Sequence, residues 1–258
     1  MRFLLLAMIV CSARAQTVTD IVHEYSEREA SRYDRARNYT YRQHATTRRY
    51  DRHGRMQSIS TATYEILIVN GKPVQTLIES NGSPVTQQES IRRQQALEQA
   101  AHAAPRFEDR YYEFRLEGEE EVNGRMTWVV SARMKEGAGA RIITATEGAR
   151  RKLNVKVWID QSDFECARLQ SDVLINGFGL DGKVHAVNSG LIEFMRIADG
   201  VVLPTRAVFR NDSELPLTVF PLSLAARREN HWEIEVLYTD YKNFQTDSRM
   251  LEAPAGRD

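Results

Sequence analysis

The chain contains little cysteine. Only Cys11 and Cys166 occur in 258 residues, and Cys11 lies in an N-terminal segment that we expect to be removed. A lone remaining thiol provides neither an intramolecular disulfide nor a metal cage. Cys166 is therefore interpreted as a half-buried strand thiol. Val10 stands before Cys11, where a lipid-modified cysteine requires a small residue, so lipidation is disfavoured.

Long apolar runs are also missing. The longest, Phe3 to Val10, has less than half of the roughly 20 residues that a transmembrane helix needs. Arg2 precedes this run and Ala13-Arg14-Ala15 follows it, a pattern typical of a secretory signal peptide. We expect residues 1–15 to be a signal peptide cleaved after Ala15. Residues 16–258 are expected to form a single periplasmic domain without a transmembrane segment.

The chain lacks an excess of charge of either sign. Its 35 basic and 35 acidic residues balance, which gives no indication of a nucleic-acid partner. The densest basic patch comprises Arg48, Arg49, Arg52 and Arg55. We interpret it as a charged hairpin tip, with a contact for lipid headgroups or an acidic partner as the alternative.

Sequence signatures of catalysis are absent. The chain has no G-x-S-x-G, no Walker loop and no H-E-x-x-H. Its six histidines are not spaced with carboxylates or thiols as metal ligands would be. We expect no metal, no cofactor and no enzymatic activity, with a hydrolase or isomerase as the less favoured alternative.

A helix is predicted from Thr17 to Ala36. Val18, Ile21, Val22 and Tyr25 follow the i, i+3, i+4, i+7 spacing of one helix face. The second half of this segment is rich in charged residues, and we expect it to be solvated.

A second helix is predicted after Ser83-Pro84. Thr86 and Glu89 have the spacing of a capping box, and Pro105 ends the pattern. Its apolar stripe is thin, so we place it across the open side of a sheet as a lid. The stripe consists of Ile91, Leu97 and Ala101.

The rest of the chain alternates with a period of two between turn signals such as Asn81-Gly82 and Asn123-Gly124. In one such hairpin, Val155, Val157 and Ile159 share a dry face. The pattern predicts a mainly β protein of the α+β class. We expect one strongly curved antiparallel sheet of about eight to eleven strands, with the two helices inserted or appended.

The apolar faces of these strands exceed what the two helices can cover. A single apolar sheet face must curl over something, so an incompletely filled cavity for an apolar ligand is predicted, with a closely packed sandwich as the alternative. The residues predicted to line the cavity are Tyr41, Tyr64, Ile66, Ile68, Ile78, Ile91, Leu97, Phe114, Leu116, Trp128, Val130, Val155, Val157, Ile159, Leu169, Val173, Trp232, Ile234 and Val236.

The stretch VWIDQSDFECARLQ resembles a known family. Trp158-Ile159-Asp160 followed by Arg168-Leu169 is similar to the strand–turn–strand of the LolA/LolB-type lipoprotein carrier superfamily. DGVVLPTRAVF and YTDYKNF likewise resemble outer-membrane lipoprotein-sorting proteins. The resemblance implies a half-open antiparallel barrel closed by a helical lid, an apolar cavity for acyl chains, and no catalysis.

Two functions are compatible with this resemblance. The first is a monomeric periplasmic carrier or binding protein that holds lipid or lipoprotein acyl chains and releases them passively. Each buried methylene would contribute about 0.8 kcal/mol to such binding. The second is a periplasmic sensor that binds a protein partner of the cell envelope, or an envelope-stress ligand, through its curved sheet.

Overall fold

The computed structural model describes most of the chain after the N-terminal segment. The described residues are 16–36, 38–69, 72–86, 111–135, 150–176, 185–197, 200–217 and 226–243. In chain order, the elements are α1 (Val18–Ala36), β1 (Tyr39–Tyr50), β2 (Met56–Val69), β3 (Lys72–Ser80), β4 (Ser83–Pro84), β5 (Tyr112–Val122), β6 (Arg125–Met134), β7 (Arg150–Asp160), β8 (Cys166–Asn176), β9 (His185–Arg196), β10 (Val202–Leu217) and β11 (Ala226–Asn243).

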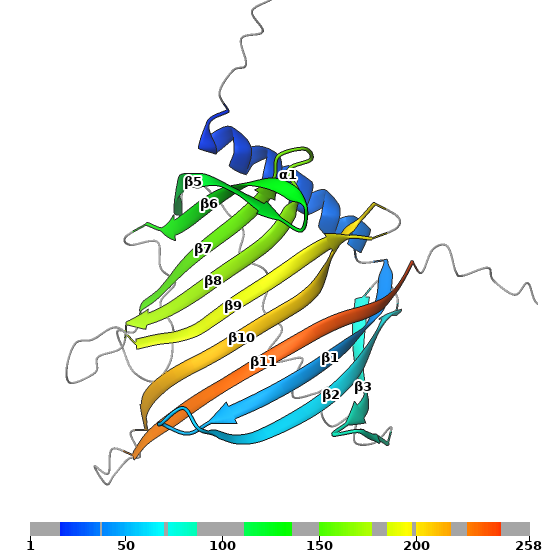
Figure 1. The fold of residues 1–258 in the computed structure, drawn as a ribbon, viewed down its shortest axis with the longest axis vertical. Helices are drawn as coiled ribbons and strands as arrows, with labels where there is room; N and C mark the ends of the chain where they lie inside the picture. The colour runs from blue at the N-terminus through cyan, green and yellow to red at the C-terminus, as the bar shows by residue number, and fades with distance from the viewer. Residues whose placement is uncertain are drawn as a thin grey trace, which may run out of the picture.

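All eleven strands belong to one antiparallel sheet that does not close (Figure 1). The spatial order is β4-β3-β2-β1-β11-β10-β9-β8-β7-β6-β5. Each strand from β5 to β11 therefore pairs with its sequence neighbour, and β11 returns to pair with β1. The predicted strand number and the open, curved architecture are confirmed.

Two of the predicted Asn-Gly turns have the backbone geometry that joins twisted strands. Asn81 and Gly82 have φ values of 48° and 77°, and Asn123 and Gly124 have 52° and 75°. Two successive positive φ values are typical of a type I′ turn, which asparagine and glycine tolerate.

The prediction of a helix start at Ser83-Pro84 is wrong. After the turn at Asn81-Gly82 these two residues form the short strand β4, in which Ser83 pairs with Ser80. The hairpin geometry overrides the helix-start signal, because the turn directs the chain back along β3. The rest of the predicted helix, including Ile91 and Leu97, lies outside the described residues.

The first predicted helix is confirmed as α1. Thr17 caps it: the backbone N–H of Asp20 donates to Thr17 Oγ1 at 3.2 Å, and the Thr17 N–H donates to Asp20 Oδ2 at 3.1 Å. This reciprocal pair satisfies N-terminal amides that lack a partner within the helix. Ile21, Val22 and Tyr25 are buried, so the apolar stripe predicted from the sequence is the face that packs.

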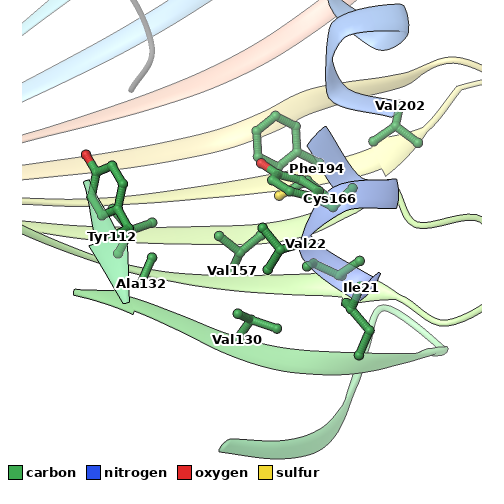
Figure 2. Close-up of a cluster of buried hydrophobic side chains, with 12 residues drawn as sticks. Ile21, Val22, Tyr112, Val130, Ala132, Val157, Cys166, Phe194 and Val202 are labelled. Carbon is green, nitrogen blue, oxygen red and sulfur yellow. The ribbon is translucent and has the colours of Figure 1, made fainter. Parts of the chain in front are cut away.

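The main core lies between α1 and one side of the sheet. Figure 2 shows Ile21 and Val22 of α1 beside side chains of β6 to β10. We call the side of the sheet that α1 covers the inner face, and the opposite side the outer face. Val155, Val157 and Ile159 belong to this core with exposed fractions of 3%, 3% and 1%. The predicted dry face of this hairpin is therefore its inner face.

One expectation of partial exposure is wrong. Cys166 was expected to be half-buried, but only 1% of it is exposed because it lies in the core shared with α1. The second half of α1 was expected to be solvated, and most of its described side chains are exposed. Arg32 is partly buried there: it lies over the ring of Phe194, 5.1 Å from its centroid, and forms an ion pair with Glu29. Arginine can bury its stem and planar head in this way when a carboxylate neutralises it.

A pair of substitutions on adjacent residues tests the face assignment. Val157→Asp should lower the free energy of unfolding by about 3 kcal/mol or more, because a charge in the core under α1 has no water to solvate it. Lys156→Gln should cost less than about 1 kcal/mol, since Lys156 forms a partly exposed pair with Glu117. Urea denaturation of both variants measures the two effects, and equal losses would show that the faces are wrongly assigned.

Candidate functional site

The inner face divides into two halves with different cover. The core cluster that contains α1 takes its sheet side chains from β5 to β10. Within the described part of the chain, none of its members comes from β1, β2, β3 or β11. The half formed by these four strands is the candidate ligand-binding face.

The register of β11, β1 and β2 defines which side chains line this face. Val236 lies opposite both Ala45 of β1 and Ala207 of β10, and Ala207 is fully buried. Directly paired residues share a face of the sheet. Ile234 and Tyr238 lie two positions either side of Val236 and therefore face inward with it. These side chains form an apolar strip on β11.

Three tyrosines gather at one end of this strip. The ring of Tyr41 lies 6.0 Å from that of Tyr238 and 5.2 Å from that of Tyr241. In a regular strand, residues 238 and 241 would point to opposite faces. A bulge at Asp240, which has a φ of 57°, shifts the register so that both tyrosines point inward. Asp240 itself forms an ion pair with Arg42 at 3.5 Å.

The three phenol groups lie in a desolvated environment. Burial raises the pKa of Tyr238 to about 12, and it raises the pKa values of Tyr41 and Tyr241 as well. The phenol of Tyr241 donates a hydrogen bond to the carbonyl of Pro204 at 2.5 Å. All three groups are neutral at physiological pH and keep their donor hydrogen, and the hydrogen of Tyr241 is already engaged by Pro204.

Polar amides border the tyrosines on the inner face. Gln75 of β3 donates through Nε2 to Oε1 of Gln43 on β1 at 2.9 Å. Gln43 lies opposite Tyr238 in the register of β1 and β11. The polarity of the candidate ligand-binding face therefore changes along its length. Amides and phenols lie at one end, and aliphatic side chains lie along its middle.

The outer face carries a ladder of alternating charges across the strands. Arg206 donates through Nε to Glu235 Oε1 at 2.9 Å, and this hydrogen bond lowers the pKa of Glu235. In spatial order the ladder comprises Glu120, Arg168, Glu193, Arg206, Glu235 and Arg48. Such a network favours this registration of the strands more than isolated surface pairs would.

The Trp-Ile-Asp motif has a structural role in this ladder and its turn. Trp158 donates from Nε1 to Glu120 at 2.7 Å, and the guanidinium of Arg168 lies 5.3 Å from the Trp158 ring centroid. Asp160 accepts hydrogen bonds from the backbone N–H and the hydroxyl of Ser162 at 2.7 and 2.6 Å. Trp158 and Arg168 therefore stabilise the hairpin on the outer face and Asp160 stabilises its turn, whereas Ile159 and Leu169 of the same motif pack in or against the inner core.

An ion pair ties the end of α1 to the same turn. Arg35, in the last turn of the helix, lies 2.6 Å from Glu165, which is 5% exposed. Arg196 of β9 approaches the same carboxylate at 3.5 Å. The two cations neutralise a buried charge that would otherwise be costly, and they fix α1 over the β5–β10 half of the sheet.

The predicted basic patch is not a uniform cationic surface. Arg48 pairs with Glu233 and Glu235 in the outer ladder, at 3.1 and 3.3 Å, whereas Arg52 and Arg55 are exposed. A pocket of about 410 Å³ opens at this end of the sheet and contains charges of both signs. It is lined by Tyr50, Asp51, Arg52, Gly54, Arg210, Asn211, Asp212, His231, Trp232 and Glu233.

Two other kinds of site are absent from the described residues. No three histidine, cysteine, aspartate or glutamate side chains of residues 16–243, outside the gaps, come together as metal ligands would. No helix in the same described ranges has the length and apolar character needed to cross a membrane.

Most of the predicted lining residues fall into two groups. The first packs in or against the α1 core and comprises Phe114, Trp128, Val130, Val155, Val157, Ile159 and Leu169. In the same half, Leu116 pairs with Val130 and is 40% exposed.

The second group lies in the half beyond β10. It comprises Tyr41, Tyr64, Ile66, Ile78, Trp232, Ile234 and Val236. Ile66 is buried with 3% exposed, and the others are half-buried. Ile68 and Val173 lie in β2 and β8, but their side chains are outside the described part.

Tyr238 and Tyr241 contribute to the candidate face but are not in the predicted lining set. The inward direction of Tyr238 is predicted from the sequence, because it continues the alternation of Ile234 and Val236. The inward direction of Tyr241 is not, because alternation places it on the opposite face and only the bulge at Asp240 turns it inward.

No protein-family model and no curated protein matches the chain. Among solved structures, it is similar to a LolA superfamily protein from Nitrosomonas europaea at 12% identity, covering 88% of this chain and 94% of that one, with a TM-score of 0.35.

Two further solved structures are similar. One is a domain described as an outer membrane lipoprotein-sorting protein, from Vibrio parahaemolyticus (11% identity, 88% of this chain and 95% of that one, TM-score 0.38). The other is a DUF1329 family protein from Desulfovibrio piger (10%, 91% and 95%, 0.40).

The desolvated tyrosines predict a loss of stability at alkaline pH. The pKa of Tyr238 is about 12 in the folded protein and about 10 in an unfolded chain. Its contribution to stability is therefore fully present below about pH 10 and is lost as the pH rises towards 12. Urea denaturation between pH 9 and 12 should show a shallower decline for Tyr238→Phe than for the unsubstituted protein. Identical declines would mean that Tyr238 is not desolvated.

Proposed function

We propose that this protein is an exported, periplasmic binding protein or carrier for lipid or lipoprotein acyl chains, and that it holds a chain against the candidate ligand-binding face without catalysis. The observation that carries the proposal is the division of the inner face. The β5–β10 half packs on α1, whereas the half formed by β11, β1, β2 and β3 presents half-buried apolar and aromatic side chains outside that core.

The composition of this half favours an alkyl chain over a polar ligand. Ala45, Val236 and Ile234 offer aliphatic surface across two neighbouring strands, and none of them carries a polar side-chain atom. Burial of each methylene against such surface contributes about 0.8 kcal/mol. A single acyl chain could thus be bound firmly enough to be carried and still be released to an acceptor with a deeper apolar site.

The edges of the sheet are compatible with a protein that stays soluble while holding such a ligand. The edge strand β5 bears Glu119, Glu120 and Glu121 and is interrupted by an irregularity between Leu116 and Gly118. Charges and bulges on an edge strand discourage pairing with another sheet. The open inner face is therefore available to a small ligand while edge-to-edge association through β5 is suppressed.

Native mass spectrometry of protein exported from cells and purified without detergent tests this proposal. We expect adducts with the masses of lipids. Ile234→Glu should reduce the retained fraction at least several-fold, since it places a charge where the chain would lie. Leu237→Glu is the matched control: Leu237 is three residues away on the same strand, and it is 45% exposed on the outer face.

Lipid retained equally by both variants would place the ligand elsewhere. An absence of lipid adducts from the unsubstituted protein, together with failure to bind an added single-chain lipid, would contradict the proposal. That result would favour the alternative in which the curved sheet binds a protein partner.

A further inference from the structure

The tyrosine cluster makes one end of the candidate ligand-binding face chemically different from the rest. Tyr41 and Tyr238 lie at one end of the aliphatic strip formed by Ala45, Val236 and Ile234, with their rings 6.0 Å apart. An alkyl chain alone has no acceptor for the hydrogen-bond donors that these phenol groups provide. Their chemistry therefore bears on which polar group accompanies the chain.

The three phenols differ in their hydrogen bonding. Tyr241 donates to the carbonyl of Pro204. Within the described ranges, no residue accepts a hydrogen bond from Tyr41 or Tyr238, although both rings pack against neighbouring aromatic rings. Among the described residues, neither hydroxyl belongs to the fully buried polar atoms that lack a partner, and both side chains are half-buried. Each hydroxyl is therefore accessible to an acceptor that a ligand supplies, in surroundings whose partial burial raises the pKa values of both phenols.

We propose that the hydroxyl groups of Tyr41 and Tyr238 form a subsite for the carbonyl oxygen of an acyl ester, with the alkyl chain extending from there along Val236 and Ile234. This inference rests on the proposed function and specifies its ligand class as single-chain esters such as monoacylglycerols or lysophospholipids.

The backbone conformation at Asp240 fixes the positions of the tyrosine side chains. Tyr238 and Tyr241 share the inner face only because Asp240 adopts a left-handed conformation, with a φ of 57°. A non-glycine residue in this region is uncommon and is retained where the surrounding structure holds it. The hydrogen bond from Tyr241 to Pro204 and the ion pair of Asp240 with Arg42 both hold this bulge. The bulge brings the ring of Tyr241 to 5.2 Å from that of Tyr41, which gives the Tyr41 ring a fixed support.

Gln43 and Gln75 complete the polar end. Their amides are hydrogen-bonded to each other at 2.9 Å, on strands two apart in the sheet. Gln43 lies opposite Tyr238, so the amide pair adjoins the phenols. The headgroup attached to the ester would meet these amides, whereas a bare hydrocarbon would leave them unused.

A matched pair of ligands tests the subsite. Monoolein and the corresponding monooleyl glycerol ether have the same chain and headgroup, but only the ester has a carbonyl oxygen. Each is titrated against protein loaded with the neutral fluorophore N-phenyl-1-naphthylamine, and displacement is followed by fluorescence. The unsubstituted protein should bind the ester about tenfold more tightly than the ether, which two hydrogen bonds of ordinary net strength can supply.

The double variant Tyr41→Phe/Tyr238→Phe keeps both rings and removes both donors. It should bind the ether as the unsubstituted protein does and lose the preference for the ester. Tyr50→Phe, at the other end of β1 where Tyr50 pairs with Met56 and His231, is the control and should keep the preference. The circular dichroism spectrum and the urea midpoint of each variant confirm that it is folded.

The outcomes separate this inference from the proposed function. If the unsubstituted protein binds ester and ether equally, the carbonyl subsite is wrong while lipid binding stands. If the double variant keeps the ester preference, the phenols are not the donors and the inference is likewise wrong. If neither ligand displaces the fluorophore or binds directly, the proposed function itself fails.

Discussion

An open antiparallel sheet has one apolar face that must be kept from water, and the rest of this structure depends on how that face is covered. α1 covers the half from β5 to β10 and inserts Ile21, Val22 and Tyr25 into it. One helix has a contact face too narrow for eleven strands. The half formed by β11, β1, β2 and β3 therefore lies outside the α1 core, and that division motivates a binding role.

The position of α1 is fixed by polar contacts at its two ends. Thr17 and Asp20 cap its first turn, and Arg35 in its last turn pairs with the buried carboxylate of Glu165. Loss of Arg35 would leave this buried charge to Arg196 alone, at 3.5 Å, which is unfavourable. We interpret α1 as a permanent part of the core. The ligand is accordingly assigned to the half that α1 does not fill.

Much of the fold could be predicted from the sequence, because the apolar residues repeat with the period of a strand or with the period of a helix. Alternation identified the inner side chains of β7 and β11, the i, i+3, i+4 spacing identified the buried stripe of α1, and Asn-Gly pairs marked the turns. The start of the second helix at Ser83-Pro84 was predicted wrongly because a local signal competed with hairpin pairing. Local pattern carries no information on such tertiary preferences.

The candidate site was less predictable for a related reason. The predicted lining set mixed residues of both halves, because alternation shows that Val157 and Ile234 point inward without showing that α1 covers only the first. The tyrosine cluster depends on a bulge at Asp240, and a single aspartate within an alternating run does not indicate that a bulge lies there. The charges of the outer ladder were visible as residues, but their order across strands required the register.

Photo-crosslinking with a monoacylglycerol that carries a diazirine on its chain tests the central claim most directly, because peptide mapping of the product shows which half of the inner face holds the chain. The account predicts adducts in β11, β1 and β2, at or next to Ala45, Ile234 and Val236, in a population whose α1 peptides are unlabelled. Adducts concentrated instead on Val155, Val157 or Ile21 would mean that α1 moves aside to admit the ligand, and would contradict the division of the sheet into a core half and a binding half.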